Sequence, residues 1–386
     1  MTKGPSAASV ALGGLIALAV AMGIGRFVYT PILPFMAEAL GLTAAEGGVI
    51  ASANLLGYLI GALGAAITGL PGGRRGWFLA ALAISAVTTG AMGATSSMTM
   101  FLALRVIGGA ASAFVMVFGS AIVLDSLAAA GRPGLSAVHF AGVGIGIAVS
   151  ALVVSGLAAA DFGWRAHWLL SGGISLLALA AVVWLIPGGG SYERPTAAAP
   201  GGAIDRRLVA LTIAYGLFGF GYMITATFIS TMVRLSPDIH SLEPVIWLVV
   251  GLASIPSVAL WAWVGRRWGN NRSFAVACLV EGVAIVLSAF ATSAVSIVVS
   301  VMLFGGTITG IVALGLIHGR SLSAGDPRRT IALMTAVFGL GQVIGPTFAG
   351  VVFDSTGSFT APSLAAAAAL FMAAGLVGLR FSPRSL

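Results

Sequence analysis

Long apolar segments follow one another along almost the whole chain, and short polar or Gly/Pro-rich breaks separate them. Most of these segments reach the roughly 20 residues that an α-helix needs to cross the hydrocarbon core of a membrane. The pattern predicts twelve spans: 9–36, 45–70, 77–96, 98–127, 135–160, 167–187, 208–234, 243–264, 274–291, 294–321, 330–353 and 360–381. The sequence therefore predicts an all-α membrane protein of twelve transmembrane helices.

One segment reads as a linker. Residues 188–207, GGGSYERPTAAAPGGAIDRR, are rich in Gly, Pro, Ala and charge, a composition typical of a flexible, exposed connection. The segment divides the chain into an N-terminal six-helix bundle, residues 1–187, and a C-terminal six-helix bundle, residues 208–386.

Composition supports the membrane assignment and excludes a soluble globular protein. Charged residues make up only 8% of 386 and hydrophobic residues 59%, and the mean hydropathy is +1.07. The net charge of +8 is spread between apolar segments and forms no basic tract, so no nucleic-acid partner is expected. Cys278 is alone and no metal spacing occurs, so neither a metal nor another cofactor is expected.

The positions of the basic residues predict the orientation. With the N-terminus in the cytoplasm, fifteen of the nineteen Lys and Arg residues fall on the cytoplasmic side, and only Arg165 and Arg234 fall outside. Such a bias is the positive-inside rule. It predicts that both termini and the linker lie in the cytoplasm, so that a cysteine placed at Ser191 should label from inside only. We expect the protein to be an integral protein of the bacterial inner membrane.

The two halves resemble each other. GIGRFVYTPILP at 23–34 aligns with GFGYMITATFIS at 219–230, and GVGIGIAVS at 142–150 aligns with FGLGQVIGP at 338–346. IGGAASA at 107–113 aligns with FGGTITG at 304–310. Internal duplication of this kind is typical of secondary transporters built from two pseudo-symmetric bundles.

Three motifs together resemble the major facilitator superfamily. They are RVIGGAASA from Arg105, WVGRRWGNNR at 263–272 and FGLGQVIGPTFAG at 338–350. LPGGRRG, the first-half counterpart of the basic loop, lacks the usual acidic residue. GIGRFVYTPILPFM and GYMITATFIS resemble the first and seventh helices of the YbfB/YjiJ-type branch. The resemblance implies the superfamily fold and a transport function. The fifth span, GVGIGIAVS, lacks the Gly-Pro pair expected of drug antiporters, and this counts against a standard drug/proton antiporter.

Arg26 stands near the middle of the first span, where a charged side chain is costly and is usually functional. Arg105 lies inside the fourth span, and no carboxylate occurs away from the ends of the first, second, fifth, seventh, eighth, tenth and eleventh spans. A cavity with cations and no fixed anion favours an anionic ligand, because a guanidinium offers paired donors to carboxylate or phosphate. A structural role for either arginine is the alternative.

Other polar residues inside the spans extend the candidate site. Asn54 and Tyr58 are one turn apart on one helical face, although they could equally bond a neighbouring helix. The candidates for substrate binding are Arg26, Tyr29, Asn54, Tyr58, Arg105, Tyr222, Thr225 and Gln342. The candidates for coupling or gating are Arg105, Asp125, His139, Glu281 and His318, for which packing or surface ion pairing is the alternative.

The function expected from these features is secondary active transport of a small organic anion by alternating access, coupled to protons or to a counter-anion. The alternative is efflux of varied drugs or amphipathic compounds. A membrane sensor would need a soluble signalling domain, and no loop is long enough. The expected partners are a small-molecule substrate and membrane lipids, and the protein is expected to be a monomeric non-enzyme.

Overall fold

The computed structural model describes residues 6–67, 71, 73–186, 205–323 and 327–378. The described chain is helical, and no strand occurs in these ranges. The N-half contains α1 Ala7–Leu18, the π-helix η1 Ala19–Ile24, α2 Tyr29–Leu40, α3 Ala44–Ala65, α4 Arg74–Ala91, η2 Met92–Ala94, α5 Met98–Phe114, the π-helix η3 Val115–Gly119, α6 Ser120–Ala129, η4 Pro133–Leu135, α7 Ser136–Ala159 and α8 Trp164–Leu185. The C-half contains α9 Arg206–Arg234, η5 His240–Leu242, α10 Glu243–Ser254, α11 Ser257–Trp268, α12 Asn270–Ala289, α13 Ala294–Ser321, α14 Pro327–Thr356 and α15 Thr360–Gly378.

These helices confirm the predicted membrane fold. Within the described ranges, eleven helical stretches are long and apolar enough to span a membrane, and a pair bent by 43° supplies the twelfth. The bend lies between α10 and α11 at Pro256, which has no N–H for the helix ladder. Residues 188–204 of the predicted linker, 68–70 and 379–381 lie outside the described residues.

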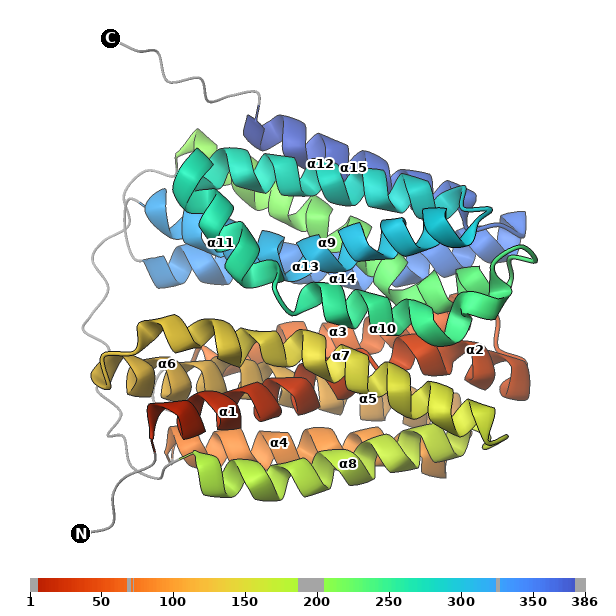
Figure 1. Cartoon of the computed structure of the whole chain (residues 1–386), viewed down its shortest axis with the longest axis horizontal. Helices are drawn as coiled ribbons and strands as arrows, with labels where there is room; N and C mark the ends of the chain where they lie inside the picture. Colours follow the sequence, from red (N-terminus) through yellow and green to blue (C-terminus); the bar gives the residue numbers. More distant parts are fainter. Residues whose placement is uncertain (1–5, 68–70, 72, 187–204, 324–326, 379–386) are drawn as a thin grey trace.

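The helices gather into two groups (Figure 1): α1–α8 below and α9–α15 above. Across the interface, α3 packs along α14 and α7 packs along α10. Glycine permits this close approach, because a Cβ at Gly48 on α3 would overlap the backbone carbonyl of Pro346 on α14. Small residues at helix interfaces are the usual means of packing membrane helices tightly.

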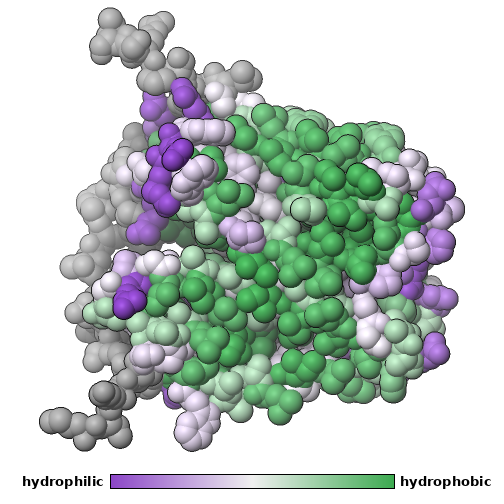
Figure 2. Space-filling view, viewed as in Figure 1, coloured by the Kyte–Doolittle hydropathy of each residue, from purple (hydrophilic) through white to green (hydrophobic). Residues whose placement is uncertain are grey.

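The two ends of the molecule differ in what they carry. We call the end at which α8 finishes (Leu185) and α9 begins (Arg206) the linker end, and the other end the opposite end (Figure 1). Figure 2 shows an apolar band between two polar end regions. Large apolar side chains in that band face outward, for example Leu177, which is 76% exposed. Such a belt is what a helical bundle presents to lipid.

One ion pair and one helix-capping interaction join the halves at the opposite end. Arg234 on α9 bonds Glu243 at 2.7 Å and reaches Glu38 of the N-half at 3.4 Å. Asp354 on α14 accepts hydrogen bonds from the backbone N–H groups of Ala44 and Ala45, at 3.0 and 2.9 Å. A carboxylate is stabilised at the positive N-terminus of a helix, so Asp354 joins α14 to the start of α3.

The orientation predicted from the basic residues is tested by cysteine labelling. In a Cys278→Ala background, a membrane-impermeant maleimide should label Ser358→Cys on intact cells, and should label Ala130→Cys only after the membrane is opened. Both positions are exposed and lie at opposite ends of the bundle. Labelling of Ala130→Cys from outside would reverse the assigned topology.

Candidate substrate-binding site

The first span, Ala7–Leu40, is broken near its middle. Between η1 and α2, residues 25–28 form turns. Pro31 has no N–H to donate back to Phe27, and Phe27 instead accepts from the Thr30 N–H at 3.3 Å. The Thr30 N–H is therefore drawn away from the carbonyl of Arg26, which would be its partner in a regular α-helix.

Arg105 on α5 supplies donors to this broken segment. Its guanidinium donates to the backbone carbonyls of Gly25 at 3.2 Å and Arg26 at 3.4 Å, and lies 4.9 Å from the ring centre of Tyr29. Asn54 on α3 donates in turn to the backbone carbonyl of Arg105 at 3.0 Å. Irregular backbone at membrane depth persists only where protein groups satisfy it, so Arg105 stabilises the break that positions Arg26.

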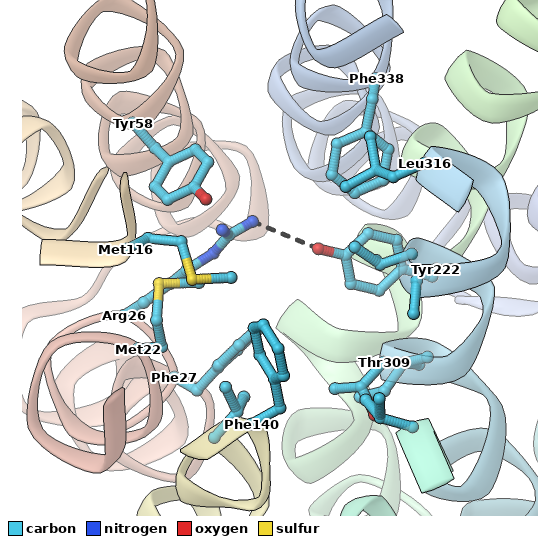
Figure 3. A pocket seen from close by; sticks show the side chains of 15 residues that line it. Met22, Arg26, Phe27, Tyr58, Met116, Phe140, Tyr222, Thr309, Leu316 and Phe338 are labelled. Atoms are coloured by element: carbon cyan, nitrogen blue, oxygen red, sulfur yellow. Dashed lines mark hydrogen bonds between the residues drawn. The ribbon is translucent and has the colours of Figure 1, made fainter. Parts of the chain in front are cut away.

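A cavity of about 180 Å³ lies between the halves beside this break (Figure 3). Its lining is mostly apolar and comes from eight elements and the 25–28 turn. The lining residues are Met22, Arg26, Phe27, Tyr58, Met116, Phe140 and Val143 of the N-half, and Tyr222, Val258, Ile308, Thr309, Val312, Ala313, Leu316 and Phe338 of the C-half.

Arg26 is the charged residue of this lining, and its side chain points across the cavity at Tyr222 (Figure 3). It is 4% exposed. One terminal nitrogen donates to the Tyr222 hydroxyl at 3.2 Å, the guanidinium lies 4.8 Å from the ring centre of Tyr58, and Nε has no hydrogen-bond partner among the described residues. Within the described part of the chain, no acidic side chain forms an ion pair with Arg26.

The Tyr222 hydroxyl receives a second hydrogen bond, from the side-chain amide of Gln342 on α14. With two donors already on its oxygen, the hydroxyl proton is left to point elsewhere. Phe218 and Phe338 stack with Tyr222, at ring-centre distances of 5.0 and 6.0 Å. The C-half thus presents a stacked aromatic wall opposite Arg26, with one polar tip.

The substrate-binding candidates lie in four different positions relative to the cavity. Arg26, Tyr58 and Tyr222 line the cavity. Gln342 contacts the wall from behind, and Tyr29, Asn54 and Arg105 form the support of the broken first span. The Tyr29 hydroxyl donates to the Gly47 carbonyl at 2.7 Å. Thr225 is buried one turn beyond Tyr222, and its hydroxyl has no partner among the described residues.

Sequence reasoning missed most of the apolar lining. Five of the missed residues lie on α13, at 308, 309, 312, 313 and 316. They share one helical face, and this spacing is the sequence signal that could have identified them as a group. The rest of the span is equally apolar, so the pattern did not distinguish a face toward a cavity from a face toward lipid.

Most of the coupling candidates lie away from the cavity. Asp125 pairs with Arg74 at 2.9 Å near the linker end, and its side chain is 71% exposed. His139 is buried, with Nε2 3.0 Å from the Ser120 hydroxyl. His318 lies in the last turn of α13, also at the linker end.

Glu281 on α12 differs from the other coupling candidates. It is fully buried, and neither of its carboxyl oxygens has a hydrogen-bond partner among the described residues. The Thr307 hydroxyl of α13 lies beside it, but donates to carbonyls of its own helix. The Glu281 helix, α12, packs along α13, and Thr307 directly precedes Ile308 of the cavity lining. Glu281 therefore sits behind the cavity wall formed by α9 and α13.

A family model described as "Uncharacterised MFS-type transporter YbfB" matches residues 18–378. The chain belongs to this family of transporters. The match confirms the resemblance found in the motifs.

Among solved structures, a mutant of the nucleoside transporter NupG has the same fold. The TM-score is 0.75 at 14% sequence identity, and the alignment covers 97% of this chain and 100% of NupG. A search of curated proteins finds no match. At this identity the structural likeness establishes the fold, and the cavity residues have to carry the argument about the substrate.

The support given by Arg105 predicts a stability defect on its removal. Arg105→Met leaves the Gly25 and Arg26 carbonyls without that donor, and an unsatisfied buried polar group costs about 1–3 kcal/mol. The variant should unfold at a clearly lower temperature than wild type in the same detergent. Arg266→Met, at an exposed site of the linker end, is the matched control, and equal melting of both variants would refute the supporting role.

Proposed function

We propose that this protein is a secondary active transporter that moves a small organic anion across the bacterial inner membrane by alternating access. The observation that carries the proposal is Arg26. It is buried in the cavity wall between the halves and is opposed by the neutral phenol of Tyr222 rather than by a carboxylate.

Arg26 is a charge without an anionic partner among the described residues, in a low-dielectric environment. A guanidinium is costly in the membrane interior, and a neutral hydroxyl compensates it less well than an anion, because charge-assisted pairs are shorter and about twice as strong. A bound carboxylate would take two donors of the planar fork. The Tyr222 hydroxyl, with its proton uncommitted, is a further donor for the same anion.

The arrangement of the halves supports alternating access. The cavity reaches from Arg26 toward the linker end, where Phe140 and Leu316 line it, while Asp354 and Arg234 bridge the halves at the opposite end. With the linker end in the cytoplasm, a cavity that opens at this end would give the substrate access from the inside. Rocking of one half against the other would exchange the closed end.

A substitution of Arg26 tests the binding role. Arg26→Ala should abolish transport of an organic anion in whole cells while the protein remains folded and membrane-inserted, since no buried carboxylate is left behind. Arg26→Lys should retain little activity, because a point charge does not reproduce the fork. A well-expressed Arg26→Ala variant that transports normally would end the proposal.

Coupling to protons is assigned to Glu281. An ionised carboxylate there would be an uncompensated buried charge, so the neutral acid is the form that suits this site. Among the described residues, Cys278 on its own helix and Tyr222 on α9 interact with it electrostatically. Among the described residues of α15, Thr360–Gly378, none is ionisable. Release of the proton thus requires a rearrangement of the helices, which is a physical basis for coupling to transport.

Glu281→Gln keeps the shape and the neutral form of this group and removes its proton. In proteoliposomes containing a pH-sensitive dye, proton entry driven by benzenesulfonate uptake should be lost in this variant, while benzenesulfonate binding persists. Benzenesulfonate stays ionised near neutral pH, so it carries no proton itself and does not contribute to the dye signal. Asp238→Asn, at an exposed loop, is the control, and undiminished proton entry with Glu281→Gln would exclude Glu281 as the carrier.

The apolar lining also favours the second candidate, efflux of varied amphipathic compounds. Phe27, Phe140 and Phe338 would accept many hydrophobic molecules. Efflux of neutral or cationic dyes would be insensitive to loss of Arg26, and this separates the two functions.

A further inference from the structure

We infer that the cavity takes a monoanion with a small, compact apolar body, of which aromatic monocarboxylates are the simplest members. The inference rests on the proposed function and deepens it, because it names the substrate class of the same site. Three features of the cavity carry it: the number of available charges, the chemistry of the lining and the volume.

The first feature is charge. Of the two arginines at this depth, Arg105 donates to the backbone carbonyls of Gly25 and Arg26 and is not part of the lining. The lining therefore offers a single cation, Arg26. A dianion would place its second charge among apolar side chains without a partner, and an unpaired buried charge is strongly disfavoured.

The second feature is the lining. Its hydroxyl groups belong to Tyr58, Tyr222 and Thr309 alone, and that of Thr309 already lies 3.5 Å from the backbone carbonyl of Ser254. Met22, Met116 and the surrounding aromatic and aliphatic side chains supply the remainder (Figure 3). A sugar-like body would lose hydrogen bonds to water that this wall does not replace. An apolar body loses none.

The third feature is size and shape. A cavity of about 150 Å³ lined by apolar side chains accommodates benzene, and the present one measures about 180 Å³. The space therefore suits one ring and one small anionic group. Phe27, Phe140 and the stacked pair of Phe338 and Tyr222 offer ring faces and edges to an aromatic guest, and methionine side chains adapt to its outline.

The experiment compares five probes on the purified protein by calorimetric titration at neutral pH. Benzoate is the monoanion with an apolar body, benzamide its neutral counterpart, isophthalate the dianion, gluconate the polar monoanion and adenosine a nucleoside. Benzoate should bind most tightly. Benzamide and adenosine, which carry no anionic group, should bind at least roughly tenfold more weakly, as expected for loss of one charge-assisted hydrogen bond. Isophthalate and gluconate should also bind more weakly, because a second charge or several hydroxyl groups would be buried without partners.

Two variants locate the binding. Arg26→Gln should weaken benzoate binding at least roughly tenfold and leave benzamide binding little changed. Leu316→Asn should weaken benzoate while narrowing its advantage over gluconate, because it adds a polar group to the lining. Arg266→Gln, exposed at the linker end, is the control and should bind benzoate like wild type.

The outcomes separate the inference from the proposed function. Tighter binding of isophthalate or gluconate, still dependent on Arg26, would overturn the apolar monoanion and leave anion transport standing. Equal binding of benzoate and benzamide, unchanged by Arg26→Gln, would overturn both. Tight binding of adenosine alone would overturn both in favour of a nucleoside. Absence of benzoate binding at millimolar concentration would overturn the inference, and the transport test of Arg26→Ala would then decide the proposed function.

Discussion

The site depends on one constraint: a broken helix in hydrocarbon has to find hydrogen-bond partners within the protein. Pro31 interrupts the first span, and the carbonyls of Gly25 and Arg26 accept from Arg105. Tyr29 and Asn54 then hold Arg105 in place. Arg105 thus bonds backbone carbonyls within the N-terminal bundle and thereby fixes the position of Arg26. The Arg26 side chain points toward the C-terminal bundle.

The hydrogen bond between Arg26 and Tyr222 is also a contact between the two halves. Thr30 adds a bond to the Ala226 carbonyl at 2.6 Å, so the first and seventh helices touch just beyond the cavity. An anion that takes the place of the phenol would change an inter-half contact as well as fill a site. Such a link between binding and the relative position of the halves is what alternating access requires.

Hydropathy was sufficient to predict the spans, because a run of roughly 20 apolar residues has few other structural solutions. The alignment of the two halves also paired Arg26 with Tyr222, and the structure joins these residues by a hydrogen bond. The hydrogen bonds of Arg105 to the Gly25 and Arg26 carbonyls could not be predicted from the sequence. They depend on how far the first transmembrane helix unwinds and on how the fourth is rotated about its axis. The aliphatic lining from α13 could not be predicted either, because Ile308 and Leu316 read the same whether they face lipid or a cavity.

The length of the first span has a consequence for the ion pairs at the opposite end. Glu38 lies twelve positions after Arg26 in the sequence, which corresponds to a rise of about 18 Å along a helix axis. Half of the hydrocarbon layer is only about 15 Å thick. With Arg26 near mid-depth, Glu38 and its partner Arg234 lie at the level of the lipid headgroups, in reach of water and counter-ions. An exposed ion pair stabilises a protein by at most about 1 kcal/mol. Separating Glu38 from Arg234 therefore adds little to the free energy needed to open that end of the protein.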